Sequence, residues 1–530
     1  MCRAPTSRFE LAVIGCGAAA VCLLNGLLET DLPVGRLRLY DGSSGLWRGR
    51  AYQRDAPVLR LNSVPGDMSA LGSDPEHFDR WLAARDTVNG QSANTFDPYS
   101  GARFVPRALY GDYLQYAAED ALTRLRAAGW DVELVPHHVK SVVQSAGKTE
   151  LLTLDGRRQK ADYVVLCVGR GSPSDEYALA GSPRFIADPY PVQQTLGEVE
   201  PEASVGVIGS GLTAMDVVLA LRESKHRGPI TFLSRGGVLP SVRQKPIQYK
   251  IRHFTSEGIQ RAAGENGITL DTVVRLLRQE LETAGEDISA VQMEIESLIG
   301  ESPVQRLRRQ LAEVDTESIA LRVLQTAVPS TGPQVWPLLS SEEKLRLLRG
   351  SYRAILALCC PMPPATAAKV LDMIEREQLH LSDGIQEIRY NGSSYTAVTT
   401  HGTVSCDVVI NAVNAPAHKI PPSAASLVDS LIGQGVASYS PAGGLEVDPR
   451  TSQLIGDDRP QGRFYALGDL TFGTFFFTFG IPAITDRARD ICRDLAFHVS
   501  AATAPPPIHL DFSIALHNRN MGSTTLEELA

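Results

Sequence analysis

The sequence predicts an α/β protein in which two nucleotide-binding units are combined with a helical segment. Two glycine-rich turns, each between a short apolar strand and a helix, lie about two hundred residues apart. Residues 251–380 instead space their apolar side chains as helices do. Strand–turn–helix units of this kind build parallel sheets with helices on both faces, and the helical stretch has no place in such a sheet. We therefore expect two sheet domains and an α-helical insertion.

The composition agrees with a folded chain of several domains. With 530 residues, the chain is too long for one core, and two or three domains are expected. Apolar residues make up 43% and charged residues 21%, which excludes disorder on a large scale. The net charge of −9 provides no basic field for nucleic acid or for an anionic membrane surface. Neither is an expected partner.

The first glycine turn lies in residues 10–24, ELAVIGCGAAAVCLL. Gly15 permits a tight turn, Gly17 lets the backbone approach a pyrophosphate, and the small Ala20 lets the helix pack against the strand. The helix N-terminus offers free N–H groups to the phosphates. The next strand ends at Asp41, whose carboxylate can accept hydrogen bonds from both hydroxyls of a ribose. The pattern predicts a dinucleotide site; the alternative is a purely structural turn.

The pattern recurs in residues 204–216, SVGVIGSGLTAMD. The residues expected to hold a second nucleotide there are Gly209, Ser210, Gly211, Thr213 and Ala214.

The strand after the second turn ends at Ser234 and Arg235 instead of an acid. A carboxylate would repel a ribose 2′-phosphate, whereas an arginine neutralises it and a serine donates a hydrogen bond to it. The second nucleotide is therefore expected to be NADPH rather than NADH. The alternative is a surface arginine that faces water.

Two such motifs in one chain imply two nucleotides bound head to head, with a flavin that receives a hydride from a nicotinamide. Two later segments, 161–169 and 406–414, each read as an aspartate, an apolar strand and a small-residue turn, the first ending at Gly169. A third strand ends at Gly468 and Asp469. We thus expect two Rossmann-like domains that bind FAD and NADPH.

The predicted domains are discontinuous. The FAD-binding domain is expected over 1–200 and 417–530, and the NADPH-binding domain over 201–250 and 381–416. The insertion, 251–380, is expected to hold four to six helices, including one stretch over 340–358 and a break at 329–333. Its role is either a cap or dimerisation element, or a substrate lid.

Metal and disulfide chemistry are not expected. The eight cysteines include no Cys-x-x-Cys pair, and no histidine pair has helical ligand spacing. No metal site is predicted, and a reducing cytoplasm is the expected location. Residues 9–28 are apolar like a signal peptide or an anchor, but the glycine turn inside them explains the stretch better.

Three further stretches carry a family resemblance: 49–52 (GRAY), 59–69 (LRLNSVPGDMS) and 104–114 (FVPRALYGDYL). With the two glycine motifs, the chain resembles class B flavin monooxygenases and N-hydroxylases. It looks like a bacterial subfamily that includes amino-acid N-monooxygenases and a flavin-dependent urate hydroxylase. The resemblance covers about 1–250 and 380–490. Relatives often carry a basic run near the end of the insertion, where this chain has 357–361, ALCCP.

The resemblance implies an oxidoreductase mechanism and roles for single residues. In such flavoproteins NADPH reduces FAD, and oxygen then forms a C4a-(hydro)peroxyflavin that oxidises the substrate. Asp469 would contact the ribityl–phosphate end of FAD, and Arg107 would be a cofactor-binding residue. Asn62 is the catalytic candidate, an amide near flavin and nicotinamide. The alternative is that Asn62 closes a turn before Pro65.

Two other features remain open at this stage. Five aromatic side chains in 471–480 would either wall an apolar pocket beside the flavin or pack in the core. Arg243, Lys245 and Lys250 would meet NADPH phosphates, bind an acidic substrate, or be solvated.

The sequence therefore predicts an FAD- and NADPH-dependent monooxygenase that N-hydroxylates a small amine or amino acid. Its partners would be a small-molecule substrate and molecular oxygen, and homo-oligomerisation is left open. The alternatives are a flavin-dependent C-hydroxylase of a small heterocycle, a flavin dehydrogenase or oxidase without oxygen transfer, and a nucleotide-dependent binding protein without turnover.

Overall fold

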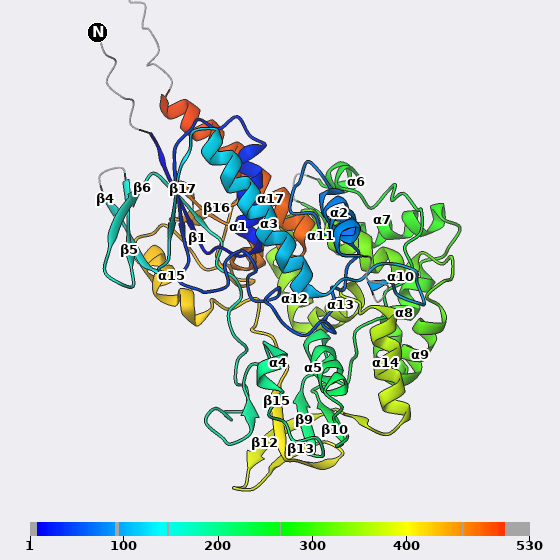
Figure 1. Cartoon of the computed structure of the whole chain (residues 1–530). Coiled ribbons are helices and arrows are strands. Elements are labelled where there is room, and N and C mark those ends of the chain that lie inside the picture. Colours follow the sequence, from blue (N-terminus) through cyan, green and yellow to red (C-terminus); the bar gives the residue numbers. More distant parts are fainter. Residues whose placement is uncertain (1–7, 91–94, 146–147, 265–266, 458, 504–530) are drawn as a thin grey trace, which may run out of the picture.

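The computed structural model of the chain describes residues 8–90, 95–145, 148–264, 267–457 and 459–503. Figure 1 shows three regions: a sheet domain that contains both the beginning and the end of the described chain, a second sheet domain below it, and a group of helices beside both. This arrangement confirms the predicted α/β fold with a helical insertion.

The first domain is built on a six-stranded sheet in the order β16-β17-β7-β1-β2-β3. All its neighbouring strands are parallel except β16 and β17. Its strands are β1 (Glu10–Ile14), β2 (Arg36–Tyr40), β3 (Asp131–Val135), β7 (Tyr163–Leu166), β16 (Gln453–Gly456) and β17 (Arg459–Ala466). The strands that carry the first glycine turn and Asp41 are therefore neighbours at the centre of the sheet.

Both faces of this sheet are covered. The helices on one face are α1 (Ala18–Leu28), α3 (Arg107–Ala127) and α17 (Ile481–Thr503), which share one apolar core with the sheet. The other face packs against α15 (Ala425–Ile432) and the small antiparallel sheet of β4 (Val139–Ser145), β5 (Lys148–Thr153) and β6 (Arg158–Ala161). Burial on both faces explains why β1 and β7 are almost wholly apolar.

The second domain has a five-stranded parallel sheet in the order β11-β10-β9-β15-β8. Its strands are β8 (Phe185–Ile186), β9 (Val205–Ile208), β10 (Ile230–Leu233), β11 (Leu379–Ser382) and β15 (Val408–Asn411). The antiparallel strands β12 (Ile385–Tyr390), β13 (Tyr395–Thr399) and β14 (Gly402–Cys406) form a separate sheet. Both β8 and the start of β11 lie outside the ranges predicted for the NADPH-binding domain.

Two helices cover one side of the second sheet and join it to the insertion. They are α5 (Leu212–Glu223), which follows the second glycine turn, and α14 (Pro364–Glu375), and both share a core with β9 and β10.

The insertion contains more and shorter helices than the sequence predicts. Its helices are α6 (Ser256–Ala262), α7 (Leu270–Thr283), α8 (Ser289–Gly300), α9 (Pro303–Ala312), α10 (Ala320–Arg322), α11 (Val328–Val335), α12 (Ser341–Gly350) and α13 (Tyr352–Cys359). With α14, they exceed the predicted four to six. A helix of 3 residues such as α10 leaves no periodic pattern to read. The expected single helix over 340–358 is interrupted at Ser351.

The break predicted at 329–333 is wrong, because these residues lie inside α11. Pro329 lies in the first turn, where a backbone N–H needs no partner within the helix. Pro333 is interior and costs one intrahelical hydrogen bond, which the buried environment of the helix tolerates.

Among the helices of the described residues, none combines the length and the apolar character that a bilayer crossing requires. The described part of the chain also brings no three His, Cys, Asp or Glu residues together as metal ligands.

Candidate functional site

A cavity of about 2160 Å³ lies between the two sheet domains and the insertion. Pockets for a single small ligand span about 300–1,000 Å³, so this cavity has room for more than one. The predicted site residues in its wall are Gly15, Gly17, Asp41, Asn62, Arg107, Gly169, Gly209, Ser210, Gly211, Thr213, Ser234, Arg235, Gly468 and Asp469. Ala20 and Ala214 lie beneath the two turns, fully buried, where a small side chain lets each helix approach its sheet.

The fold requires glycine at only one of the two glycine positions of the first turn. Gly15 has φ +95°, and a Cβ there would lie 2.6 Å from the carbonyl oxygen of Cys167. The fold itself therefore demands glycine at this position. A Cβ at Gly17 would meet Gly49 Cα at 3.4 Å as its nearest neighbour, which is an ordinary contact. Packing does not demand glycine at 17, and the open space on the cavity side fits the close approach of a pyrophosphate.

Asp41 holds the first turn in shape. Its Oδ2 accepts a hydrogen bond from the Cys16 N–H at 2.8 Å, and its Oδ1 accepts one from the Ser43 N–H at 2.8 Å. Each carboxylate oxygen retains a lone pair for a ribose hydroxyl. Burial, with a smaller contribution from Asp41, raises the pKa of the Cys16 thiol. Cys16 is thus a neutral packing residue.

A loop over 43–50 closes above the first turn. The Trp47 N–H donates to the carbonyl of Cys16 at 2.6 Å, and Gly49 lies against Gly17. Trp47 itself is buried. This covering loop is a part of the site that sequence reasoning missed, although its GRAY segment carried the family resemblance.

The second turn has the same internal geometry but no cover. Gly209 has φ +103°, and its N–H donates to the carbonyl of Leu233 at 2.8 Å. A Cβ at Gly211 would meet no atom within 4 Å. Ser210 Oγ donates to the Val238 carbonyl at 2.8 Å, and Thr213 Oγ1 bonds the side chain of Asn414 at 3.2 Å. The N-terminus of α5 is therefore open to the cavity and fits a second phosphate group.

The end of β10 gathers positive charge. Ser234 Oγ accepts a hydrogen bond from the Gly237 N–H at 2.9 Å, while Arg235 is 53% exposed and pairs with Glu176 at 3.5 Å. Arg353, from α13, lines the same part of the cavity. Burial and then the nearby charge of Arg235 lower the pKa of Arg353. Two guanidinium groups near each other repel, whereas a phosphate dianion bound by both would be attracted to each of them.

Sequence reasoning missed Arg353, because only the fold brings the insertion to the end of β10. Among the residues that the structure describes, its guanidinium has no hydrogen-bond or ion-pair partner.

Asp469 lies where a cofactor hydroxyl could reach it. Its Oδ1 accepts hydrogen bonds from Arg170 Nη2 at 2.9 Å and from Thr478 Oγ1 at 3.3 Å. Within the described chain, Oδ2 has no partner. Gly468 has φ +88°, and a Cβ at Gly169 would meet nothing within 4 Å. Arg170, which orients Asp469, is a second residue that the sequence did not single out.

Asn62 lies half-buried in the cavity wall. The alternative role, closing a turn before Pro65, gains no support, because the short helix Pro65–Asp67 begins after Val64 without a side-chain hydrogen bond. No described residue hydrogen-bonds the Asn62 amide. The amide is therefore free for a ligand, and its catalytic role stays a prediction.

Arg107 joins the two domains. Its Nη1 lies 2.6 Å from Asp216 Oδ2 on α5, and its Nε donates to the Arg60 carbonyl at 3.0 Å. Tyr190 O–H also donates to Asp216. Burial opposes the charge, but Asp216 and Tyr190 outweigh it and raise the pKa of Arg107. Its guanidinium is used largely in this ion pair, and its predicted contact with a cofactor stays a prediction.

The aromatic run over 471–480 serves both purposes that the sequence left open. Phe472, Phe477 and Phe479 line the cavity, whereas Phe475 and Phe476 pack only in the core. The apolar wall lies next to Asp469 in the chain and is continuous with the helical insertion through Trp336, whose ring is 4.5 Å from that of Phe476.

Comparison with known proteins gives one family model and a set of similar structures. Residues 12–171 match the model of a family described as FAD-NAD(P)-binding. No curated protein sequence matches the chain significantly.

Three solved structures share the fold over most of the chain. The cadaverine monooxygenase of desferrioxamine biosynthesis from Erwinia amylovora is 12% identical with a TM-score of 0.58, covering 92% of this chain and 95% of its own. The L-lysine 6-monooxygenase from Pseudomonas syringae is 14% identical with a TM-score of 0.57, covering 94% and 100%. The ornithine hydroxylase from Pseudomonas aeruginosa is 14% identical with a TM-score of 0.56, covering 93% and 99%.

The matched model contains the first glycine turn and Asp41, and thus confirms the predicted FAD-binding domain at the level of FAD-NAD(P) binding. Residues 12–171 of this chain match an FAD-NAD(P)-binding family model, and the chain shares its fold with these three solved structures.

Proposed function

We propose that the protein is an FAD- and NADPH-dependent monooxygenase that N-hydroxylates a small amine or amino acid. One observation carries the proposal: a single cavity joins both glycine turns, the free amide of Asn62 and an apolar aromatic wall. The names of three proteins with this fold, a cadaverine monooxygenase, an L-lysine 6-monooxygenase and an ornithine hydroxylase, support an amine or amino acid as the substrate.

The two cofactors would divide the wall between them. FAD would lie on the first turn, with its pyrophosphate at Gly17, its ribose at Asp41 and its ribityl–phosphate end at Asp469. NADPH would lie on the second turn, with its phosphates at Gly211 and its 2′-phosphate between Arg235 and Arg353. When bound, FAD supplies the acceptance of a hydride from NADPH and the activation of molecular oxygen.

The residues of this chain would bind, orient and exclude water. The N-termini of α1 and α5 bind phosphates and so fix the two nucleotides relative to each other. The Asn62 amide can both donate and accept hydrogen bonds without adding charge. It could therefore orient the edge of a flavin or nicotinamide ring. Phe472 and Phe477 keep that part of the cavity apolar, which limits the access of water to the reacting atoms.

The cysteines of the cavity favour oxygenation over dithiol chemistry. Cys359 and Cys360 both line the wall. Burial and then Cys360 raise the pKa of Cys359, and burial raises that of Cys360 to about 12, although Arg243 and Arg170 oppose it. Because the thiolate is the reactive form, neither residue is set up for disulfide exchange at neutral pH.

The test is NADPH consumption by the purified protein across a panel of amines, amino acids and small heterocycles, with the product mass recorded. We expect an amine product that has gained one oxygen atom. A heterocycle oxygenated at carbon would select the C-hydroxylase, and loss of two hydrogens would select the dehydrogenase. A protein that binds both nucleotides and never consumes NADPH would be a binding protein.

We further propose molecular oxygen as the second substrate and the reducing cytoplasm as the location. The cysteines of the described residues are all free, which supports a reducing compartment. Self-association remains open, and gel filtration of the purified protein decides it.

A further inference from the structure

Arg243 presents an unpartnered guanidinium to the cavity. It lies in the segment 239–245 that follows the second turn, and it is part of the cavity wall. Its Nε is buried without a hydrogen-bond partner. In the described part of the chain, no other atom of its guanidinium has a hydrogen bond or an ion pair either. Arg170, in the same wall, instead has a carboxylate of its own in Asp469 at 2.9 Å.

Asp67 lies across from Arg243 without closing an ion pair. The two side chains affect each other: burial raises the pKa of Asp67 while Arg243 lowers it, and burial lowers the pKa of Arg243 while Asp67 raises it. Yet no nitrogen of Arg243 comes within 4.0 Å of a carboxylate oxygen of Asp67. Arg243 and Asp67 thus line the same cavity without an ion pair between them.

The helical insertion holds the segment that carries Arg243. The Val242 N–H donates to Gln310 Oε1 at 3.0 Å, and the Gln244 N–H donates to Gln325 Oε1 at 2.9 Å. Gln310 in turn donates to Glu294 at 2.7 Å.

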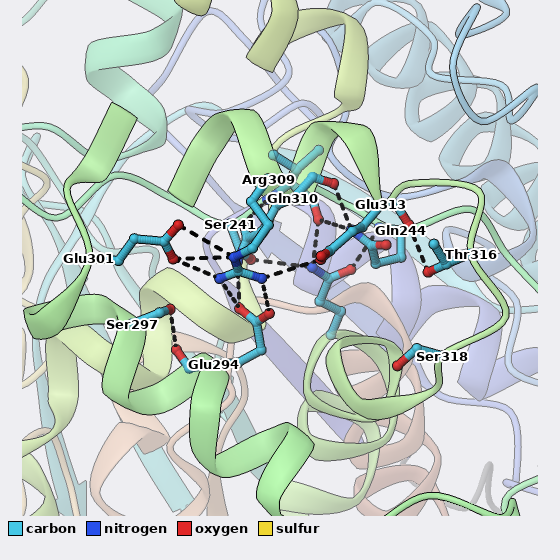
Figure 2. A network of polar contacts seen from close by, with 12 residues as sticks. Ser241, Gln244, Glu294, Ser297, Glu301, Arg309, Gln310, Glu313, Thr316 and Ser318 are labelled. Carbon is cyan, nitrogen blue, oxygen red and sulfur yellow. Dashed lines mark hydrogen bonds and ion pairs between the residues drawn. The ribbon is translucent and has the colours of Figure 1, made fainter. Parts of the chain in front are cut away.

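Figure 2 shows how this network continues to Arg309, which pairs with Glu294 at 2.6 Å, Glu301 at 2.9 Å and Glu313 at 3.2 Å. The Arg243 backbone also pairs with Met362, its N–H donating to that carbonyl at 2.9 Å. These hydrogen bonds hold the backbone on both sides of Arg243. The Arg243 side chain itself has no hydrogen bond or ion pair within the described residues.

The Arg243 side chain is half-buried, and its Nε has lost its hydration without gaining a partner, which is unfavourable for a cation. Its planar fork matches a carboxylate, which can accept two parallel hydrogen bonds from it. A simple anion would be repelled by Asp67, whereas a ligand that carries an anionic and a cationic group would satisfy both side chains.

We propose that Arg243 is a specificity-determining residue that binds a carboxylate of the substrate, opposite Asp67, which accepts a cationic group. This inference rests on the proposed function and makes an amine with an acidic group the preferred substrate over a simple diamine. NADPH phosphates are a poorer match for Arg243, since its charged neighbour is Asp67, five residues after Asn62, rather than the Arg235 and Arg353 pair.

The experiment compares ligands that differ only in the carboxylate. Binding of L-lysine and of its decarboxylated counterpart cadaverine to the FAD-loaded protein is measured by calorimetry, for the wild type, Arg243→Met and Arg243→Lys. In Arg243→Met, we expect the Kd of lysine to rise roughly tenfold to a hundredfold, the range of a charged hydrogen bond. The Kd of cadaverine and that of NADP⁺ should change less than about twofold. Arg243→Lys keeps the charge but loses the fork, and should recover part of the loss.

Lys245→Met is the matched control. Lys245 is two residues away and carries the same charge, but it lies outside the cavity wall and pairs with Asp315 at 2.5 Å. Its substitution should leave both dissociation constants unchanged.

Each outcome bears on the inference separately from the proposed function. Wild-type protein that binds cadaverine as tightly as lysine overturns the role of Arg243, even if an amine is hydroxylated. Equal losses for lysine and cadaverine, or a loss confined to NADP⁺, also overturn it. A selective loss for lysine in a protein that never transfers oxygen would support Arg243 and refute the monooxygenase.

Discussion

The two glycine turns have the same backbone geometry and opposite surroundings. Gly15 and Gly209 have nearly the same positive φ, and each N–H donates to the end of the neighbouring strand at 2.8 Å. The first turn, however, lies under the loop 43–50 and close to Gly49, whereas no atom lies within 4 Å of a Cβ at Gly211. The glycine motif determines how a phosphate is bound. The presence or absence of a covering loop determines how easily the bound nucleotide dissociates. We infer a retained flavin and an exchangeable nicotinamide nucleotide.

The ribose ends of the two sites differ as well. In the first site the carboxylate of Asp41 accepts hydrogen bonds from the backbone of Cys16 and Ser43. The second site has Arg235 and Arg353 in the corresponding region, with Glu176 as a partly exposed counter-charge. Charge therefore separates the two nucleotides: a phosphorylated ribose suits the second site, and only a ribose with free hydroxyls suits the first.

The largest effect is expected from a bulky side chain at the second glycine of each turn. Gly17→Val should give colourless protein without FAD, because the side chain would occupy the space of the pyrophosphate. Gly211→Val should keep the yellow FAD and lose NADPH binding. Flavin absorbance and NADP⁺ titration measure the two. If Gly17→Val still binds FAD fully, the assigned site is wrong.

Gly15→Ala is the control for the first turn. There the left-handed backbone and the 2.6 Å contact with Cys167 would disturb the protein itself. A melting temperature below that of FAD-free wild type is expected for this variant, whereas Gly17→Val should melt close to FAD-free wild type.

Next in size is the charge at the end of β10. Arg235→Ala should weaken NADPH binding by roughly 1.5–3 kcal/mol, the range for charged hydrogen bonds, and leave NADH kinetics nearly unchanged. The measurement is kcat/KM for the two nucleotides. Equal losses for both would mean that Arg235 serves the fold instead of the 2′-phosphate.

Arg353→Ala should have the same sign and a smaller magnitude, roughly 0.5–1.5 kcal/mol, if Arg353 shares the phosphate with Arg235. Arg349→Ala is a suitable control, since Arg349 also lines the cavity from the insertion and carries the same charge. An unchanged preference for NADPH in Arg353→Ala would leave Arg235 as the sole determinant and would separate the insertion from nucleotide choice.

The smallest expected effect concerns Asn62, between the two sites. Asn62→Ala should still consume NADPH, because the two phosphate sites do most of the positioning, but it should release more oxygen as hydrogen peroxide at the expense of product. Peroxide and product are measured together. Full coupling would remove Asn62 from the mechanism, and equal loss of flavin and both activities would give it a structural role.

Features that depend on neighbours in the chain could be predicted from the sequence. The strands, both glycine turns and the residues after β2, β10 and β17 follow from local pattern, because a buried parallel strand is apolar throughout and a turn needs glycine. The small residues of the two motifs, Ala20 and Ala214, follow from the same pattern, but both lie buried beneath their turns, and a contact of Ala214 with a nucleotide stays a prediction.

Features that depend on tertiary contact were missed. Arg353, Arg170 and the Arg243–Asp67 pair come from segments far apart in the sequence, and nothing in a single arginine indicates what it will face. The loop over Gly17 has positive φ at Trp47 and at Gly49, and it was missed because Trp47 carries no turn signal and nothing local shows that Gly49 will lie against Gly17. In the insertion, a proline inside a helix misled the prediction, since burial outweighed the local preference against it.

The Arg107–Asp216 ion pair has a consequence for how the molecule unfolds. Arg107 begins α3 of the first domain, and Asp216 lies on α5, the helix that caps the second turn. Removing one partner of a buried pair costs about 3–5 kcal/mol, since the other charge stays buried. Unfolding of one domain alone would break this ion pair and lose its free energy. We therefore expect heating to unfold both domains in one cooperative transition. Asp216→Asn should split that transition into two in a calorimetric scan, the lower one belonging to the second sheet domain.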